Sequence, residues 1–205
     1  MWNEDIVRRL ATAGAATVYE AYGRKGNLDP TVSRISSSRQ IAGPAFCVVC
    51  TRGDNLALHR AVAEAHEGDI LVVAGHGDCC GYLGDILAEA AAVRGIAGIV
   101  VDGFVRDRAE LQKLDFPVWA RGLSIKGATK TSPGQIGIAM DCAGVRIEQG
   151  DLIVADDDGV TCVAKSDVPT VIGGVQQRLE QEIDVRSKLR LGALTLDLLD
   201  LRKYC

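Results

Sequence analysis

The stretch ILVVAGHGDCCGYLGDILAEAAAVRGIAGIVVDGFVRD (residues 70–107) decides the fold of this chain. It opens with an apolar, β-branched run (70–74), passes a glycine-rich turn (81–85) and enters a segment (86–93) whose apolar residues recur at helical spacing. A second β-rich run (99–101) follows. The order strand, turn, helix, strand predicts a βαβ unit with two parallel strands.

Charged side chains occupy the two turns that follow these strands. Asp85 ends the first turn, and Arg106 and Asp107 end the second. The carboxyl ends of neighbouring parallel strands lie at one sheet edge, so we expect these three residues to meet in one crevice. Two carboxylates, one guanidinium and a glycine-lined helix N-terminus predict a metal-assisted site for a small anion.

Each of these residues also has a purely structural interpretation. Asp107 and Glu110 have the spacing of a capping box, and Asp85 stands where a helix N-cap is expected. Arg106 taken alone is typical of a solvated surface arginine. The joint spacing within one βαβ unit favours a functional site.

Composition excludes several classes of protein. At 205 residues the chain is long enough for one buried core, so we expect residues 1–205 to form a single domain. Hydrophobic residues make up 47% and aromatics only 4%, which favours an aliphatic, sheet-rich core. The net charge of −4, without a basic run, argues against nucleic-acid binding, and no apolar stretch is long enough to span a membrane. The acidic N-terminus and the odd number of cysteines, seven, favour a cytoplasmic location.

The remaining sequence predicts helices at both ends and more strands between them. Before the βαβ unit we expect two short helices (5–13 and 16–22), an exposed loop (26–38), a buried strand within 40–50 and a helix from 55. After it, turn signals separate short β-like runs (117–120, 136–140, 145–147, 152–155 and 160–164). Asp158-Gly159 is typical of a hairpin turn, and a last helix begins at Asp167. The prediction is an α/β fold with a βαβ half and a β-meander half.

Motifs spread over residues 41–164 resemble those of a known family. The segments are IAGPA (41–45), GDNL (53–56), GDILV (68–72), GYLGD (81–85), GIVVDGFVRD (98–107), PVWARG (117–122) and ADDDGV (155–160). In order and spacing they resemble the family named after regulator of ribonuclease activity A, which also contains the 4-hydroxy-4-methyl-2-oxoglutarate / 4-carboxy-4-hydroxy-2-oxoadipate aldolases. The resemblance implies a three-layer β/β/α sandwich of the swivelling-domain type, assembled as a homotrimer or homohexamer with sites between subunits. One departure is Glu148-Gln149 before Gly150, where the family usually has proline.

The aldolase members of that family carry the motif Asp-x20-Arg-Asp, which Asp85, Arg106 and Asp107 match. The resemblance implies that Asp107 binds a divalent cation, Mg²⁺ or Mn²⁺, with water and substrate oxygens as further ligands. It implies that Arg106 stabilises charge on an enolate and that Asp85 handles a proton through a water molecule.

The resemblance also implies a substrate-binding segment around the first turn. Its residues are Tyr82, Leu83, Gly84 and Asp85, together with Arg106. Main-chain amides at this helix N-terminus can hold the substrate carboxylate. Glu180 or Glu182 of a neighbouring subunit would support the site, and the local sequence does not choose between them.

The function implied is a class II-like aldolase that releases pyruvate from a 4-hydroxy-2-oxo acid in the degradation of aromatic compounds, with oxaloacetate decarboxylation as a side activity. The partners expected are a small 2-oxo acid and further copies of the chain, without nucleic acid or membrane. Two alternatives stay open. One is a non-catalytic regulator that binds ribonuclease E, and the other is a lyase or decarboxylase for a different 2-oxo acid.

Four other signals have structural interpretations. Cys47 and Cys50 lie three apart in a strand and therefore face opposite sides, as core residues would. The segment 76–80 lacks a second ligand pair at zinc spacing and is interpreted as a loop beside the pocket. His59 is interpreted as a packed histidine. Three basic side chains either face extra substrate carboxylates or lie in a solvated loop: Arg121, Lys126 and Lys130.

Overall fold

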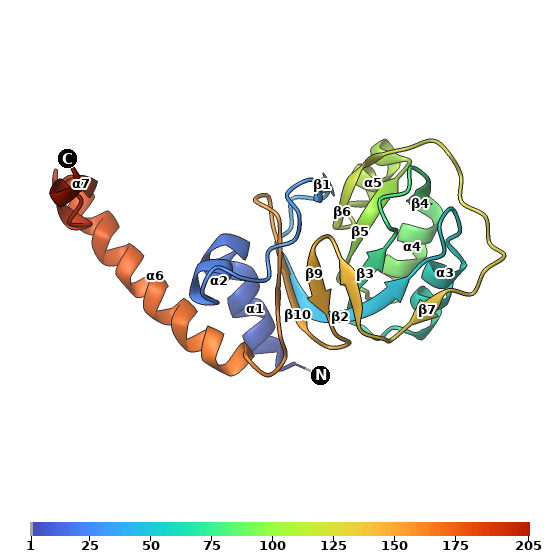
Figure 1. The fold of residues 1–205 in the computed structure, drawn as a ribbon, viewed down its shortest axis with the longest axis horizontal. Coiled ribbons are helices and arrows are strands. Elements are labelled where there is room, and N and C mark those ends of the chain that lie inside the picture. Colours follow the sequence, from blue (N-terminus) through green and yellow to red (C-terminus); the bar gives the residue numbers. More distant parts are fainter. Residues whose placement is uncertain (1) are drawn as a thin grey trace.

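The structure, a computed structural model, describes residues 2–205 as a mixed α/β fold built on a curled β-sheet (Figure 1). Its strands are β1 (Ser33–Ser36), β2 (Ile41–Val49), β3 (Ile70–Ala74), β4 (Gly81–Leu83), β5 (Gly98–Val105), β6 (Val118–Leu123), β7 (Gln135–Ile136), β8 (Met140–Cys142), β9 (Val145–Ile147), β10 (Leu152–Ala155) and β11 (Val160–Val163). Its helices are α1 (Glu4–Ala13), α2 (Ala15–Ala21), α3 (Leu56–Glu64), α4 (Asp85–Val93), α5 (Arg108–Leu114), α6 (Val168–Arg190) and α7 (Thr195–Leu198), followed by the 3-10 turn η1 (Arg202–Tyr204).

The predicted βαβ unit forms the centre of the nine-stranded sheet. Seven of its strands have the order β1-β6-β5-β3-β2-β10-β11, while β4 pairs with β5 and β7 pairs with β2. Strands β3 and β5 pair in parallel, from Ile70 opposite Gly98 to Ala74 opposite Asp102. The glycine-rich segment expected as a turn is instead a short strand, β4, which pairs in parallel with the end of β5. Strand β4 therefore brings the start of α4 to the carboxyl end of β5.

Alternating side chains on the strands divide the core into layers. On one face of β3, Leu71 and Val73 pack with α3, α4 and α5, while on the other Val72 packs with the β8–β9 hairpin. Strand β10 in turn presents Leu152 and Val154 to α1, α2 and α6. Figure 1 shows α3–α5 on one side of the sheet and the hairpin on the other. This is the three-layer β/β/α arrangement that was expected.

Three expectations about the strands were wrong. The loop predicted over 26–38 contains β1, which pairs with β6, and its Leu28 and Val32 are buried. The run 136–140 is divided between β7 and β8 because Gly137, at φ 71°, turns the chain. The supposed meander does not form a separate half, because β10 joins the main sheet by pairing with β2.

The C-terminal helix leaves the body of the molecule. Its first turns bury Val168, Val171 and Val175, but the rest of α6 extends away from the sheet and ends in α7 (Figure 1). Apolar side chains on this extension are exposed, with Leu191 at 89%. Within residues 2–205, no helix has both the length and the apolar character needed to cross a membrane.

Two features predicted from local sequence are confirmed. Cys47 and Cys50 lie in different core clusters on opposite faces of the sheet, and burial raises the pKa of each thiol to about 12. Strands β10 and β11 form the antiparallel hairpin predicted around Asp158-Gly159. The alternation of side chains along a strand and the residues of the turn were sufficient for these two predictions.

A buried carboxylate fastens the β6–β7 loop (residues 124–134) to the start of α3. Asp54 Oδ2 accepts hydrogen bonds from the Thr131 amide at 2.6 Å and the Thr129 hydroxyl at 2.7 Å, and Oδ1 accepts one from the Leu56 amide at 2.9 Å. Burial opposes ionisation of Asp54, but the hydrogen bonds from Thr131, Leu56 and Thr129 outweigh it and hold the pKa well below its usual value. The loop is therefore held against α3.

We expect Asp54→Asn to lower the free energy of unfolding by about 1–3 kcal/mol at pH 7, because a neutral amide replaces a charged acceptor of several hydrogen bonds. The folded pKa is depressed, so the stabilisation is present above about pH 4 and is lost as the pH falls further. Thermal unfolding across pH 3–7 measures it. Asp141→Asn, which alters an exposed carboxylate, is the control. A constant difference between wild type and Asp54→Asn over that range would contradict this account.

Candidate active site

Arg106 and Asp107 follow directly after β5, where the chain turns into α5. Asp107 adopts a left-handed conformation, φ 60°, which is uncommon outside glycine and costs energy. Its Oδ2 lies 3.2 Å from Arg106 Nε and accepts a long, 3.4 Å hydrogen bond from the Asp85 amide. The structure thus brings together all three residues of the Asp-x20-Arg-Asp motif.

The two capping interpretations were wrong in detail. Asp107 precedes α5 but its side chain makes no capping hydrogen bond, because the carboxylate turns towards Arg106 and the Asp85 amide. The N-cap of α4 is Gly84, and Asp85 is the first helical residue, with Oδ1 accepting a 2.8 Å hydrogen bond from the Ile86 amide. Arg106 is not fully solvated, since its side chain is 46% exposed.

Close packing at β4 explains the two glycines of the turn. A Cβ atom on Gly84 would lie 2.4 Å from Asp107 Oδ2 and 3.0 Å from Arg106 Nε. On Gly81 it would lie 2.7 Å from the Ser124 carbonyl oxygen. Both glycines are required by space rather than by φ, because any side chain would push the motif apart.

Arg106 lines two pockets, not the single crevice that the sequence predicted. The first, about 170 Å³ and called here the Asp85 pocket, contains Gly84 and Asp85. The second, about 300 Å³ and called the Asp107 pocket, contains Asp107 and the exposed Ile125. The two carboxylates of the motif therefore face different spaces, and the guanidinium group is common to both.

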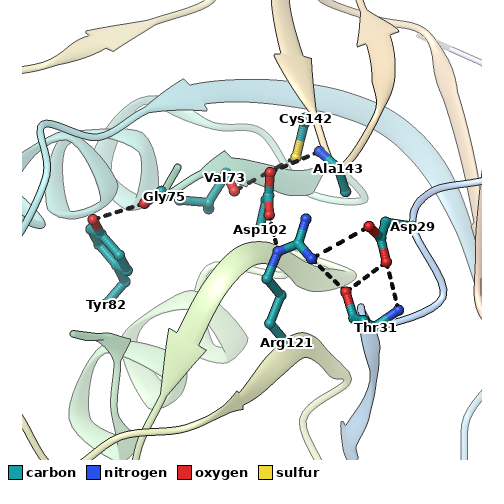
Figure 2. A network of polar contacts seen from close by, with 9 residues as sticks. All are labelled: Asp29, Thr31, Val73, Gly75, Tyr82, Asp102, Arg121, Cys142 and Ala143. Carbon is teal, nitrogen blue, oxygen red and sulfur yellow. Dashed lines mark hydrogen bonds and ion pairs between the residues drawn. The ribbon is translucent and has the colours of Figure 1, made fainter. Parts of the chain in front are cut away.

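Tyr82 and Leu83 of the predicted substrate-binding segment have fully buried side chains. The Tyr82 hydroxyl donates a hydrogen bond to the Gly75 carbonyl and accepts one from the Gly53 amide, both at 3.1 Å, and Figure 2 shows the ring directed at Gly75. Burial raises the pKa of Tyr82 to about 12. These two residues can therefore contribute only main-chain groups to a ligand.

The structure adds two residues that the sequence interpretation did not assign to the site, one at the N-cap of α3 and one within α3. Asn55 and His59 both line the Asp85 pocket. Asn55 Nδ2 donates to the Tyr82 carbonyl at 2.8 Å, while its buried Oδ1 has no hydrogen-bond partner within residues 2–205. His59 is half-buried, and burial, with a smaller effect of Lys130, lowers its pKa. Their four-residue spacing was the available signal, because it places both on one helix face.

The three basic residues, Arg121 within β6 and Lys126 and Lys130 in the loop after it, lie in different environments. Lys130 lines the Asp85 pocket, whereas Lys126 is exposed and lines neither pocket. Arg121 binds Asp102 and lies 3.6 Å from Asp29, in the polar network beside the β8–β9 hairpin (Figure 2). A role for Arg121 in facing substrate was therefore wrong, because its charge is already neutralised there.

The two glutamates proposed as inter-subunit supports lie on the exposed part of α6. Glu180 accepts a 2.7 Å hydrogen bond from Gln176, and Glu182 lies 3.6 Å from Arg186. Neither lines the Asp85 or Asp107 pocket of its own chain. Any contact with a site would have to be made in another copy.

The donor atoms at this site fit a hard cation that keeps most of its own shell. No group of three or more His, Cys, Asp or Glu side chains converges within residues 2–205. Asp107 offers a carboxylate that is 34% exposed and opens into a pocket. Mg²⁺ and Mn²⁺ accept one carboxylate with water and substrate oxygens, so the residues present fit such an ion.

Comparison with known proteins identifies relatives in sequence and in fold. A protein of Halalkalibacterium halodurans named "Putative 4-hydroxy-4-methyl-2-oxoglutarate aldolase" is 35% identical over 201 residues, which cover 98% of this chain and 93% of that protein. RraAS2 of Streptomyces coelicolor, described as an unusual member of the RNase ES inhibitor RraA protein family, superposes with a TM-score of 0.83 at 28% identity, covering 92% and 100% of the two chains.

A third similarity concerns the fold alone. An uncharacterized protein of Pseudomonas syringae pv. tomato superposes with a TM-score of 0.84 at 22% identity, covering 94% of this chain and 95% of that one. The family model described as "RraA-like: Aldolase/RraA" matches residues 14–162. This range includes the whole Asp-x20-Arg-Asp motif and all the strands, apart from the last residue of β11. This chain belongs to the RraA-like family.

Proposed function

We propose that this protein is a divalent-metal-dependent, class II-like aldolase. It would cleave a 4-hydroxy-2-oxo acid, such as 4-hydroxy-4-methyl-2-oxoglutarate or 4-carboxy-4-hydroxy-2-oxoadipate, to pyruvate and decarboxylate oxaloacetate as a side activity. The observation that carries the proposal is the convergence of Asp85, Arg106 and Asp107 at the start of α4. The name of the Halalkalibacterium relative supports it.

The substrate carboxylate binds at the N-terminus of α4. Gly84 provides no side-chain cap there, and a helix N-terminus attracts negative charge. The Asp85 amide already donates to a carboxylate oxygen of Asp107, at 3.4 Å. A substrate carboxylate would replace this long contact with a shorter, charge-assisted hydrogen bond.

Arg106 stabilises the charge that appears when the C3–C4 bond breaks. The electrons of that bond pass to the pyruvate fragment, and negative charge develops on its keto oxygen. The Arg106 guanidinium, held between the two pockets by Asp107, donates hydrogen bonds to that oxygen. Asp107 would hold a divalent cation, which when bound would supply Lewis-acid polarisation of the keto group.

Asp85 handles the proton. The C4 hydroxyl must lose its proton as it becomes the new carbonyl, and C3 of the pyruvate enolate must gain one. The Asp85 carboxylate lines the pocket beside Arg106 and can accept the first proton through a water molecule and return it to C3. Atoms and charge then balance without an external reagent.

Metal-dependent cleavage is the direct test. Wild type should release pyruvate from 4-hydroxy-4-methyl-2-oxoglutarate with Mg²⁺ or Mn²⁺ and stop with EDTA. Asp107→Asn should reduce kcat/KM about 1,000-fold, since a Lewis acid contributes several kcal/mol and each 1.4 kcal/mol is tenfold. Asp115→Asn is the matched control, because Asp115 ends the same helix, α5, in a similar left-handed conformation, φ 52°. Turnover unchanged by EDTA and by Asp107→Asn would overturn the proposal.

A second prediction separates the two reactions by their need for a base. Asp85→Asn should reduce kcat for aldol cleavage about 100- to 1,000-fold, because general-base catalysis contributes that much. Oxaloacetate decarboxylation should lose far less, since that substrate has no C4 hydroxyl to deprotonate. Pyruvate release from both substrates measures the ratio. Equal losses in the two reactions would remove Asp85 from the role of base.

Homo-oligomer formation, as a trimer or hexamer, is part of the proposal. Apolar side chains are exposed both beside the site, at Ile86 (79%) and Ile125 (98%), and on the C-terminal extension, including Leu191. Surfaces of this kind are typical of subunit contacts. The extension of one copy would then bring Glu180 or Glu182 to the site of another.

The oligomer has its own test. Light scattering on the intact chain should give a mass three or six times that of one chain. Removing residues 191–205 deletes much of the exposed apolar surface and should shift the population to smaller species. A monomeric intact chain at micromolar concentration would contradict the assembly, whatever the activity.

A ribonuclease-binding regulator is the second candidate function. The observation that favours it is the similarity to RraAS2, which is described as belonging to an RNase ES inhibitor family. The two functions are separated by one comparison. Inhibition of ribonuclease E by this protein, without pyruvate release from any 4-hydroxy-2-oxo acid, would favour the regulator.

A further inference from the structure

Two basic side chains line the Asp85 pocket in addition to Arg106. They are His59, from α3, and Lys130, from the β6–β7 loop. They come from elements far apart in the sequence, yet both are positioned by the same few residues at the start of α3. The mechanism of bond cleavage uses neither of them.

Hydrogen bonds at the start of α3 position both residues. The His59 amide donates to the Asn55 carbonyl at 3.2 Å, so His59 lies one helical turn beyond Asn55. Lys130 stands between Thr129 and Thr131, and both neighbours donate hydrogen bonds to Asp54, at 2.7 and 2.6 Å. Lys130 is therefore held near the pocket by its own flanking residues.

The charge in this part of the pocket is not neutralised. Within residues 2–205, neither His59 nor Lys130 forms an ion pair, and Asp85 is the only carboxylate that lines the pocket. Burial, and to a smaller extent Lys130, lowers the pKa of His59. A carboxylate bound between them would pair with the Lys130 ammonium and accept a hydrogen bond from the His59 imidazole.

We propose that His59 and Lys130 form a subsite for a second carboxylate, the one that a dicarboxylic 4-hydroxy-2-oxo acid carries on C4. This inference rests on the proposed function, because it assigns one further group of the same substrate. The first carboxylate lies at the α4 N-terminus beside Arg106, and the second lies on the α3 side of the pocket. His59 and Lys130 are then specificity-determining residues, selecting dicarboxylic over monocarboxylic substrates.

Matched substrates test the assignment. 4-Hydroxy-4-methyl-2-oxoglutarate and 4-hydroxy-4-methyl-2-oxopentanoate differ only in a carboxylate that is replaced by methyl. Lys130→Gln should raise KM for the dicarboxylic substrate about 10-fold, with kcat nearly unchanged, because it removes one charge-assisted hydrogen bond. His59→Gln should raise KM in the same direction, because it displaces the imidazole N–H donor. KM and kcat for the monocarboxylic substrate should not change in either variant.

Control variants come from the same regions of the chain. Lys126→Gln removes a lysine of the same loop that lines neither pocket, and His66→Gln removes an exposed histidine just after α3. Neither should alter the preference between the two substrates. Equal effects of His59→Gln on both substrates, or none on either, would overturn the inference while leaving the aldolase proposal intact.

A binding measurement keeps the inference testable even without turnover. Calorimetric titration with 2-oxoglutarate and with 2-oxopentanoate, which differ in the same carboxylate and have no hydroxyl to cleave, should show tighter binding of 2-oxoglutarate. The difference should largely disappear in His59→Gln and Lys130→Gln. A wild type that cleaves neither hydroxy acid would refute the aldolase alone, whereas equal binding of the two ligands would refute the subsite.

Discussion

The site depends on the parallel pairing of β4 with the end of β5. The Arg106 amide donates a 2.9 Å hydrogen bond to the Leu83 carbonyl, and this contact sets the start of α4 against the turn that follows β5. Because Gly84 has no side chain, Asp107 Oδ2 can approach the α4 N-terminus closely enough to meet the Asp85 amide. Twenty residues separate Asp85 from the pair Arg106 and Asp107 in the sequence. The short strand β4 makes them neighbours in the structure.

The two arginines near this edge show how neighbouring carboxylates decide a residue's role. Arg121 is bound by Asp102, while Asp29 and the Thr31 hydroxyl also contact it, so its donors are used within the protein. Arg106 pairs with the adjacent Asp107 and remains half-exposed between two pockets. A guanidinium group is available to a ligand only where the surrounding structure leaves donors free, and composition alone cannot show which arginine that is.

The sequence was informative where local chemistry determines the structure. Continuous apolar, β-branched runs located β3 and β5, and Asp158-Gly159 located the β10–β11 hairpin. It failed at β1, whose strand conformation depends on pairing with the distant β6. It also failed at His59, since helical periodicity cannot distinguish a core position from the wall of a pocket.

The division of the site into two pockets is a physical consequence of where the motif residues lie. Asp107 follows β5 and opens towards the end of β6, whereas Asp85 begins α4 and opens towards α3. A ligand that engages both carboxylates must therefore pass Arg106, which is the only residue common to the linings described here. In the proposed mechanism this division would keep a cation on Asp107 apart from the proton-handling Asp85, with the Arg106 guanidinium between them. Asp54 in turn holds the β6–β7 loop beside α3, so hydrogen bonds to a buried carboxylate position the far side of the Asp85 pocket.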